Sequence, residues 1–209
     1  QQVFEKAAMD SDIYLMNMPT GSGKTLCSMK FALERAVRTG KRRIIYVIPF
    51  NSIIDQTVAV LEDLFGESAS IVRHQSSFCI DDTDYDEDYK ILVRSVTENW
   101  NAQIIVTTSV QFFESVYKNK RNRLRKLHNM ADSVLIFDEA HMMPPEYLKP
   151  CLKAVSYITK LLHSEAVFLT ATMPDFRELV RKYALSSIRV TDLITDTGRF
   201  PLFKQRRFV

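Results

Sequence analysis

The chain has 209 residues, of which 46% are hydrophobic and 25% are charged, as is typical of a globular domain and not of a disordered chain. The net charge of +3 is too small to indicate a nucleic-acid partner by itself, and no apolar run approaches the length of a membrane-spanning helix. The three cysteines are odd in number and far apart, so we expect free thiols in a cytoplasmic protein with no membrane partner.

The first strong local pattern is a glycine-containing loop at residues 18–25, Met-Pro-Thr-Gly-Ser-Gly-Lys-Thr. An apolar run at 13–16 precedes it, and an amphipathic segment at 26–37 follows it and stops at Gly40. This order predicts a strand, a loop and a helix. The glycines let backbone N–H groups converge on a phosphate at the helix N-terminus, with Lys24 reaching the β- and γ-phosphates and Thr25 reaching Mg²⁺.

Strand and helix patterns alternate along the rest of the chain. Strands are predicted at 44–48, 104–106, 134–137 and 167–169, and shorter candidate strands lie at 71–72 and 188–190. Helices are predicted at 53–64 after a Ser52 cap, around 112–116, after Pro144-Pro145, and from Asp175 to about Tyr183. This alternation predicts an α/β fold with a mainly parallel sheet and helices on both faces.

An acidic segment at 80–90 interrupts the alternation. Asp82, Asp84 and Asp86 have the spacing that begins a calcium loop. However, Glu87 stands where such a loop needs glycine, and Val93 stands at the closing position that needs Glu. We therefore expect a solvated insertion and no metal site.

Two polar patterns follow buried strands. Asp138-Glu139 comes directly after the run at 134–137, where Asp138 can hold Mg²⁺ and Glu139 can act as general base on the attacking water. Thr170-Ala171-Thr172 follows the strand at 167–169, and polar groups at this end of a parallel strand face the ligand crevice of α/β sheets.

The motifs together resemble those of superfamily 2 helicases, in the same order. Residues 19–25, 138–141 and 170–172 resemble motifs I, II and III, and residues 49–56 and 107–108 resemble motifs Ia and Ib. Gln1, or alternatively Gln2, lies where the glutamine of the Q motif would stand. The stretches 46–56, 100–115 and 125–148 are similar to the CRISPR-associated helicase–nuclease of type I systems.

The resemblance implies a RecA-like first motor lobe over 1–190, followed by a linker at 191–209 toward a second lobe that this chain does not contain. The implied function is ATP-dependent translocation on single-stranded DNA in type I CRISPR interference, with ATP and Mg²⁺ as cofactors. The implied partners are a second RecA-like lobe, a His-Asp nuclease domain and the CRISPR surveillance complex.

The resemblance also implies roles for individual residues. The nucleotide would be bound by Gln1, Thr20, Gly21, Ser22, Gly23, Lys24 and Thr25, and Mg²⁺ by Thr25 and Asp138. Catalysis would use Lys24, Asp138, Glu139 and His141, and coupling to the second lobe would use Thr170, Ala171 and Thr172. DNA contacts would come from Asn51, Ser52, Gln56, Thr107, Thr108, Arg123 and Arg125.

Several alternatives stay open at this point. His141 could instead pack half-buried on the strand end, and the basic cluster at 118–126 could instead be a solvated face. The lobe could belong to a restriction-type translocase, or it could be a non-catalytic docking lobe. Met18 replaces the usual small residue of motif I, and motifs IV to VI are absent. No histidine of the chain is followed by aspartate, so no nuclease activity is assigned to it.

Overall fold

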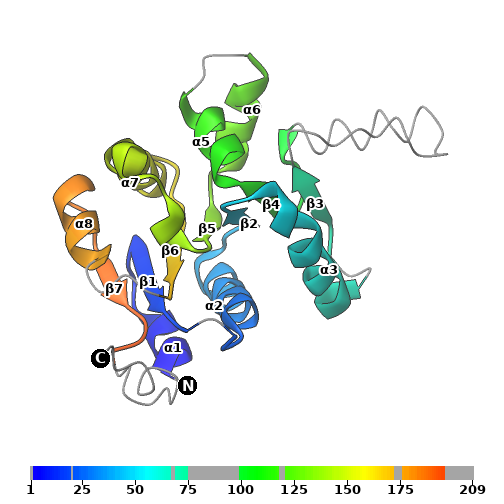
Figure 1. The fold of residues 1–209 in the computed structure, drawn as a ribbon, viewed down its shortest axis with the longest axis horizontal. Helices are drawn as coiled ribbons and strands as arrows, with labels where there is room; N and C mark the ends of the chain where they lie inside the picture. Colours follow the sequence, from blue (N-terminus) through cyan, green and yellow to red (C-terminus); the bar gives the residue numbers. More distant parts are fainter. Residues whose placement is uncertain are drawn as a thin grey trace, which may run out of the picture.

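The computed structural model describes residues 2–19, 21–66, 69–74, 99–117, 121–171 and 176–195. Its centre is a seven-stranded sheet with the strand order β3-β4-β2-β5-β6-β1-β7 (Figure 1), and every strand pair in it is parallel. The strands are β1 Ile13–Asn17, β2 Arg43–Ile48, β3 Ile71–His74, β4 Ile104–Thr108, β5 Ser133–Phe137, β6 Glu165–Thr170 and β7 Val190–Asp192. The predicted α/β fold with a parallel sheet is confirmed.

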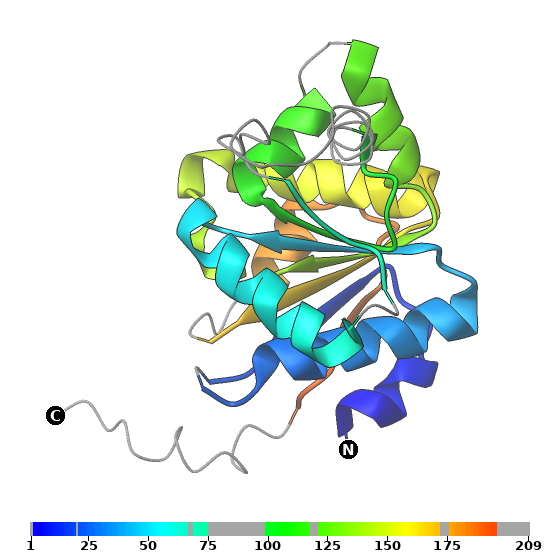
Figure 2. The same ribbon diagram turned by 90° about the vertical axis from the view of Figure 1, so that its right-hand side faces the viewer.

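Helices cover both faces of the sheet (Figure 2). The first group comprises α1 Gln2–Glu5, α2 Lys24–Thr39 and α3 Ile54–Phe65, with the short 3₁₀ helices η1 Lys6–Ala8 and η2 Asn51–Ile53. The second group comprises α5 Ser109–Tyr117, α6 Arg121–Asn129, α7 Pro145–Leu161 and α8 Phe176–Tyr183, with η5 Ala140–Met142. Each group packs on one face, so the sheet is enclosed between two layers.

Two apolar clusters fill the space between the sheet and its helices. Successive residues of a strand point to opposite faces, so Ile45 and Val47 of β2 belong to the cluster beneath α5, α7 and α8. Ile44, Tyr46 and Ile48 belong to the other cluster, beneath α2 and α3. Burial on both faces explains why the strands are continuous apolar runs in the sequence.

The structure corrects two local predictions. Ser52 lies inside η2 and no side-chain hydrogen bond caps α3, so the predicted Ser52 cap is wrong. The last strand lies at 190–192 and not at 188–190, and it pairs with β1. Leu193 after it is fully buried in the core on the α2 side of the sheet. The acidic segment at 80–90 lies outside the described residues.

A buried ion pair fixes the N-terminal segment against the sheet. Arg35 of α2 is 2% exposed and donates to both carboxylate oxygens of Glu165, at 2.7 and 2.8 Å. The same guanidinium donates to the backbone oxygen of Ala7 at 2.7 Å and lies 5.4 Å from the centre of the Tyr14 ring. Arg35 therefore joins α2, the start of β6 and the N-terminal segment.

Among the described residues, no helix is long and apolar enough to span a membrane.

Replacing Arg35 with methionine should lower the free energy of unfolding by about 3–5 kcal/mol, because the buried Glu165 carboxylate loses its main partner. Urea unfolding measures this change. Arg38→Met, at an exposed position of the same helix, is the matched control and should change stability by about 0.5 kcal/mol or less. The double variant Arg35→Met/Glu165→Leu should recover much of the loss. Equal losses for Arg35→Met and Arg38→Met would contradict this account.

Candidate functional site

The candidate site lies where β1, β6 and β5 end. These three strands are neighbours in the sheet, with β6 in the middle, and all three run in the same direction. Asn17 is in register with Thr170, and the Met18 N–H donates to the Thr170 oxygen at 3.0 Å. The loop after β1 and the residues after β5 therefore lie on either side of the end of β6.

The loop between β1 and α2 has the predicted strand–loop–helix form. Gly21 and Gly23 adopt left-handed backbone angles, with φ of 75° and 77°, which glycine adopts without strain. A Cβ atom added at either glycine would meet no atom within 4 Å, so the space beside the loop is open. No side chain caps α2, whose first N–H groups can therefore bind an anion. Met18 is buried beneath the loop and packs in the core.

An ion pair connects this loop to the end of β5. Lys24 is 8% exposed, and its ammonium donates to Glu139 Oε1. Glu139 itself has a left-handed backbone, with φ of 45°, a conformation that costs a non-glycine residue about 1–3 kcal/mol. Glu139 Oε2 lies 3.3 Å from His141 Nδ1, but neither of these buried atoms has a hydrogen-bond partner. The strained backbone of Glu139 thus directs its carboxylate toward the loop, with only one of the two oxygens hydrogen-bonded.

Asp138 is held on both of its oxygens. Oδ1 accepts the Glu139 N–H at 2.8 Å, and Oδ2 accepts the Tyr46 hydroxyl at 3.0 Å. Burial raises the pKa of Asp138 above its usual value, while the Tyr46 hydrogen bond and the Lys24 charge act in the opposite direction. Burial, and then the Asp138 charge, raise the pKa of Tyr46, so this hydroxyl keeps its proton and remains a donor.

Tyr46 is a site residue that the sequence did not identify. It occupies the middle of β2, and its hydroxyl also interacts with the side chains of Thr25 and Ser28 in the first turns of α2. It therefore contacts both sides of the candidate site. The available signal was a tyrosine within an otherwise aliphatic run, because a buried tyrosine hydroxyl usually needs a partner.

The residues present fit a magnesium-bound nucleoside phosphate. The open loop and the uncapped helix can accept phosphate oxygens, and Lys24 lies at the same place. The Thr25 hydroxyl and the Asp138 carboxylate are oxygen ligands, which Mg²⁺ prefers. The unpartnered Glu139 Oε2 is free to accept a hydrogen bond from water.

Of the remaining predicted site residues, only some lie in this region. Thr170 ends β6 beside the loop and is 3% exposed, and Ala171 follows it, also buried. Gln1, Thr20 and Thr172 lie outside the described residues. Three predicted DNA-contact residues are exposed beyond the end of β2: Asn51 and Ser52 on η2, and Gln56 on α3.

The two threonines at the end of β4 are buried, and their hydroxyls are used inside the fold. Thr107 donates to the His74 backbone oxygen at 3.2 Å, and the Thr108 hydroxyl accepts the Gln111 N–H at 3.3 Å at the start of α5. Arg125 is exposed on α6, and no contact among the described residues joins it to these strand ends. The side chain of Arg123 lies outside the described part.

A half-buried histidine lies beside Thr107. His74 ends β3, its Nε2 lies 3.0 Å from the Lys126 ammonium, and its ring meets the fully buried Trp100 ring edge-on. Burial, together with the Lys126 charge, lowers the pKa of His74 to about 4. His74 therefore stays neutral and accepts a hydrogen bond from Lys126.

Comparison with protein families and with known proteins finds helicases in both cases. The model of the family described as DEAD/DEAH box helicase matches residues 1–180. The chain is 28% identical to the CRISPR-associated nuclease/helicase Cas3 of Haloferax volcanii, over 92% of this chain but only 22% of that protein. The chain thus spans about a fifth of this relative.

Solved structures show the same fold. The T. fusca Cas3–ADP crystal structure superposes with a TM-score of 0.67 at 24% identity, covering 83% of this chain and 20% of that one. The helicase domain of Pyrococcus furiosus Hef superposes with a TM-score of 0.61 at 19% identity, covering 91% of this chain and 36% of that one. These superpositions show that the chain has the same fold as these structures.

The neutral state of His74 should make the fold sensitive to acid. Its pKa is lower in the folded chain than the unfolded value near 6.5, so the unfolded chain binds the proton more readily. Lowering the pH from 7 to 5 should therefore remove about 1–2 kcal/mol of stability through His74.

Urea unfolding at both pH values measures this loss. His74→Gln should reduce the difference between pH 7 and pH 5, because glutamine does not titrate. His128→Gln, at an exposed position of α6, should leave the difference unchanged. The same pH dependence in wild type and His74→Gln would refute the assignment.

Proposed function

Since the chain belongs to the DEAD/DEAH box helicase family, we propose that it is the first RecA-like lobe of an ATP-dependent motor that moves along single-stranded DNA. The observation that carries the proposal is the ion pair between Lys24 and Glu139, which joins the phosphate-binding loop to the end of β5. In the proposed reaction the Lys24 ammonium would bind phosphate and the Glu139 carboxylate would bind water. The ion pair holds both groups at the end of β5, where these ligands would meet.

In this proposal the ion pair is the state without nucleotide. The phosphates of ATP offer Lys24 a stronger partner than Glu139, so binding frees the Glu139 carboxylate. Oε2 of that carboxylate is already without a hydrogen-bond partner, and Glu139 can then accept a proton from the attacking water as general base. Binding of substrate and release of the base are thereby linked.

Mg²⁺ would be held by Thr25 and Asp138, and it would neutralise charge on the β- and γ-phosphates. Tyr46 positions the Asp138 carboxylate through the hydrogen bond to Oδ2. His141, 3.3 Å from Glu139, and the segment Thr170, Ala171 and Thr172 would transmit the state of the phosphates to the second lobe.

DNA would pass along the same edge of the sheet. The exposed side chains of Asn51, Ser52 and Gln56 are suited to contact the DNA backbone. The hydroxyls of Thr107 and Thr108 are buried, so in this proposal they support the loops that contact DNA. Arg123 and Arg125 would add sequence-independent attraction to phosphates.

The proposed setting is type I CRISPR interference in the cytoplasm. The support is the similarity to the Haloferax volcanii Cas3 protein, whose name describes both a nuclease and a helicase. The linker that follows the lobe would lead to a second RecA-like lobe, and the nuclease domain and the surveillance complex would be further partners. The similarity to the Hef helicase domain keeps another superfamily 2 motor as the second candidate.

The 209-residue chain alone should hydrolyse ATP slowly, because an arginine of the second lobe is worth about a thousandfold or more in rate. A DNA-stimulated ATPase assay of the chain, with and without the second lobe joined to it, tests this. Lys24→Ala supplies the blank. Glu139→Gln in the two-lobe protein should lower turnover by about 10²–10⁴-fold while nucleotide still binds. Brisk DNA-stimulated turnover by the single lobe, or indifference to Glu139→Gln, would overturn the proposal.

Tyr46→Phe should weaken Mg²⁺-dependent nucleotide binding by about tenfold, because loss of one hydrogen bond to a charged group costs about 1.5 kcal/mol. Titration of a fluorescent ATP analogue in Mg²⁺ and in EDTA measures this, and the value in EDTA should not change.

Tyr14→Phe is the matched control for that experiment. Tyr14 is also fully buried on the α2 side of the sheet, but its hydroxyl donates to the Met9 oxygen at the opposite edge. Its loss should leave the Mg²⁺ dependence intact. Equal weakening in EDTA, or by Tyr14→Phe, would argue against a positioning role for Tyr46.

A further inference from the structure

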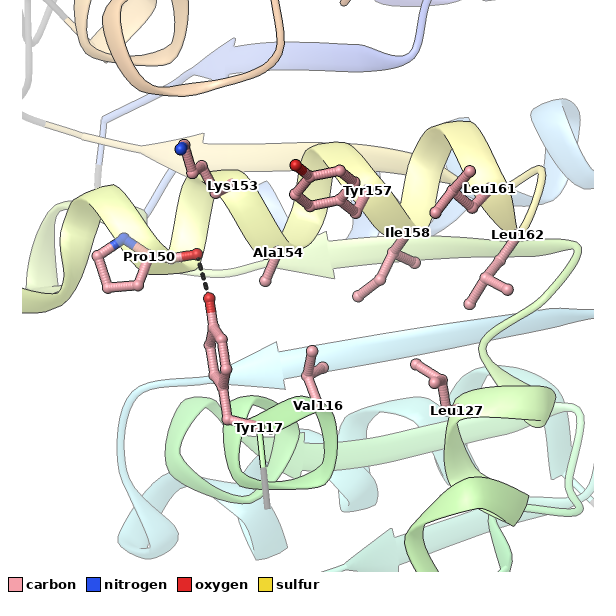
Figure 3. Close-up of a pocket in the computed structure, with 10 residues that line it drawn as sticks. All are labelled: Val116, Tyr117, Leu127, Pro150, Lys153, Ala154, Tyr157, Ile158, Leu161 and Leu162. Carbon is pink, nitrogen blue, oxygen red and sulfur yellow. Dashed lines mark hydrogen bonds between the residues drawn. The ribbon is translucent and has the colours of Figure 1, made fainter. Parts of the chain in front are cut away.

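A groove of about 390 Å³ lies between α5, α6 and α7, on the face of the sheet opposite α2 (Figure 3). Its lining is almost entirely apolar, and the main contributors are Val116, Tyr117, Leu127, Tyr157, Ile158 and Leu161. Ala154, Ile158 and Leu162 of α7 point toward the side chains of α5 and α6 across the groove (Figure 3). None of these residues takes part in the proposed nucleotide site.

The walls of the groove are unusually exposed for apolar side chains. Leu161 is 70% exposed, Tyr117 is 56% exposed and Tyr157 is 48% exposed. Contiguous apolar surface of this kind marks an interaction site more often than isolated exposed residues do. The Tyr117 hydroxyl donates to the Pro150 oxygen at 2.6 Å, so one end of the groove has a defined shape (Figure 3).

The spacing of the α7 residues indicates the form of the occupant. Pro150, Ala154, Tyr157 and Leu161 lie three or four residues apart and form a stripe along one face of the helix. At 1.5 Å per residue this stripe is about 16 Å long, which matches about three turns of a second helix. Amphipathic helices bind such grooves through apolar residues with the same spacing.

The charged residues around the groove indicate which charge a bound partner would carry. Lys149 and Lys153 are exposed on α7, Arg125 is exposed on α6, and none of the three has an ion-pair partner among the described residues. The sequence of α6, Arg-Asn-Arg-Leu-Arg-Lys-Leu-His-Asn, contains no acidic residue. A helix that enters the groove therefore meets positive charge on the α7 side, where Lys153 lines the groove.

We propose that this groove binds an amphipathic helix of a partner protein, with apolar residues in the groove and acidic residues flanking them. A second copy of the chain fits less well, because it would bring Lys149 and Lys153 against the same basic surface. Nucleic acid also fits less well, because the floor offers aliphatic groups and the Tyr117 hydroxyl is already used. The acidic flanks would speed association and set specificity.

Fluorescence anisotropy with the full 209-residue chain tests the proposal. The probe is a labelled helical peptide about 16 residues long, with leucines every three or four positions and glutamates flanking them. A second peptide carries lysines in place of the glutamates, and a third has the first composition in scrambled order. The glutamate peptide should bind with a Kd of about 1–10 μM, and the other two at least about tenfold more weakly.

Variants place the binding at the groove. Leu161→Glu should weaken binding of the glutamate peptide about tenfold or more. Val37→Glu, at an 85% exposed position of α2 on the other face, is the matched control and should change nothing. Lys149→Glu with Lys153→Glu should reverse the preference toward the lysine peptide. Circular dichroism verifies that each variant is folded.

Three results would overturn the proposal. The first is equal binding of all three peptides. The second is displacement of the glutamate peptide by single-stranded DNA together with weaker DNA binding by Leu161→Glu, which would make the groove a nucleic-acid surface. The third is a dimer in light scattering that Leu161→Glu converts to a monomer, which would make a second copy the occupant.

Discussion

The parallel pairing of β1 with β6 and of β6 with β5 is the constraint on which the candidate site depends. Because the three strands run in the same direction, their following loops meet at one edge of the sheet, although Lys24 and Glu139 are 115 positions apart in the chain. The hydrogen bond from Met18 to Thr170 fixes the loop against the end of β6. The Lys24–Glu139 ion pair and the Tyr46–Asp138 hydrogen bond then complete the arrangement across that strand end.

The charged groups of the fold serve two purposes at opposite edges of the sheet. At one edge, Arg35 meets both oxygens of Glu165, and the pair is fully satisfied. At the other edge, burial disfavours the charged form of Asp138, Glu139 has a strained backbone, and Glu139 Oε2 lacks a hydrogen-bond partner. The incomplete hydrogen bonding of these groups costs stability, but it leaves them able to bind a ligand. This contrast is typical of a binding site supported by a rigid scaffold.

The two faces of the sheet also differ in what they offer to partners. The face covered by α2 and α3 leads to the proposed phosphate-binding loop, and α2 supplies Lys24 and Thr25 from its first turn. The face covered by α5 to α8 carries the exposed apolar groove with its basic surroundings. A partner helix bound there would contact α7, which follows η5 and the Asp138–Glu139 turn in the chain. The geometry thus separates the proposed motor chemistry from the proposed docking surface while keeping both on one sheet.

The sequence by itself determined the fold class, the seven strands to within a few residues, and the loop and the acidic pair that meet at the candidate site. It could do so because strands buried on both faces must be continuous apolar runs, and because Gly21 and Gly23 are required by the left-handed turns of the loop. It missed Tyr46, the buried state of Thr107 and Thr108, and the groove. Those features depend on which residues meet across the sheet, and only the tertiary structure decides that, because hydrogen bonds and packing between distant segments leave no local pattern in the chain.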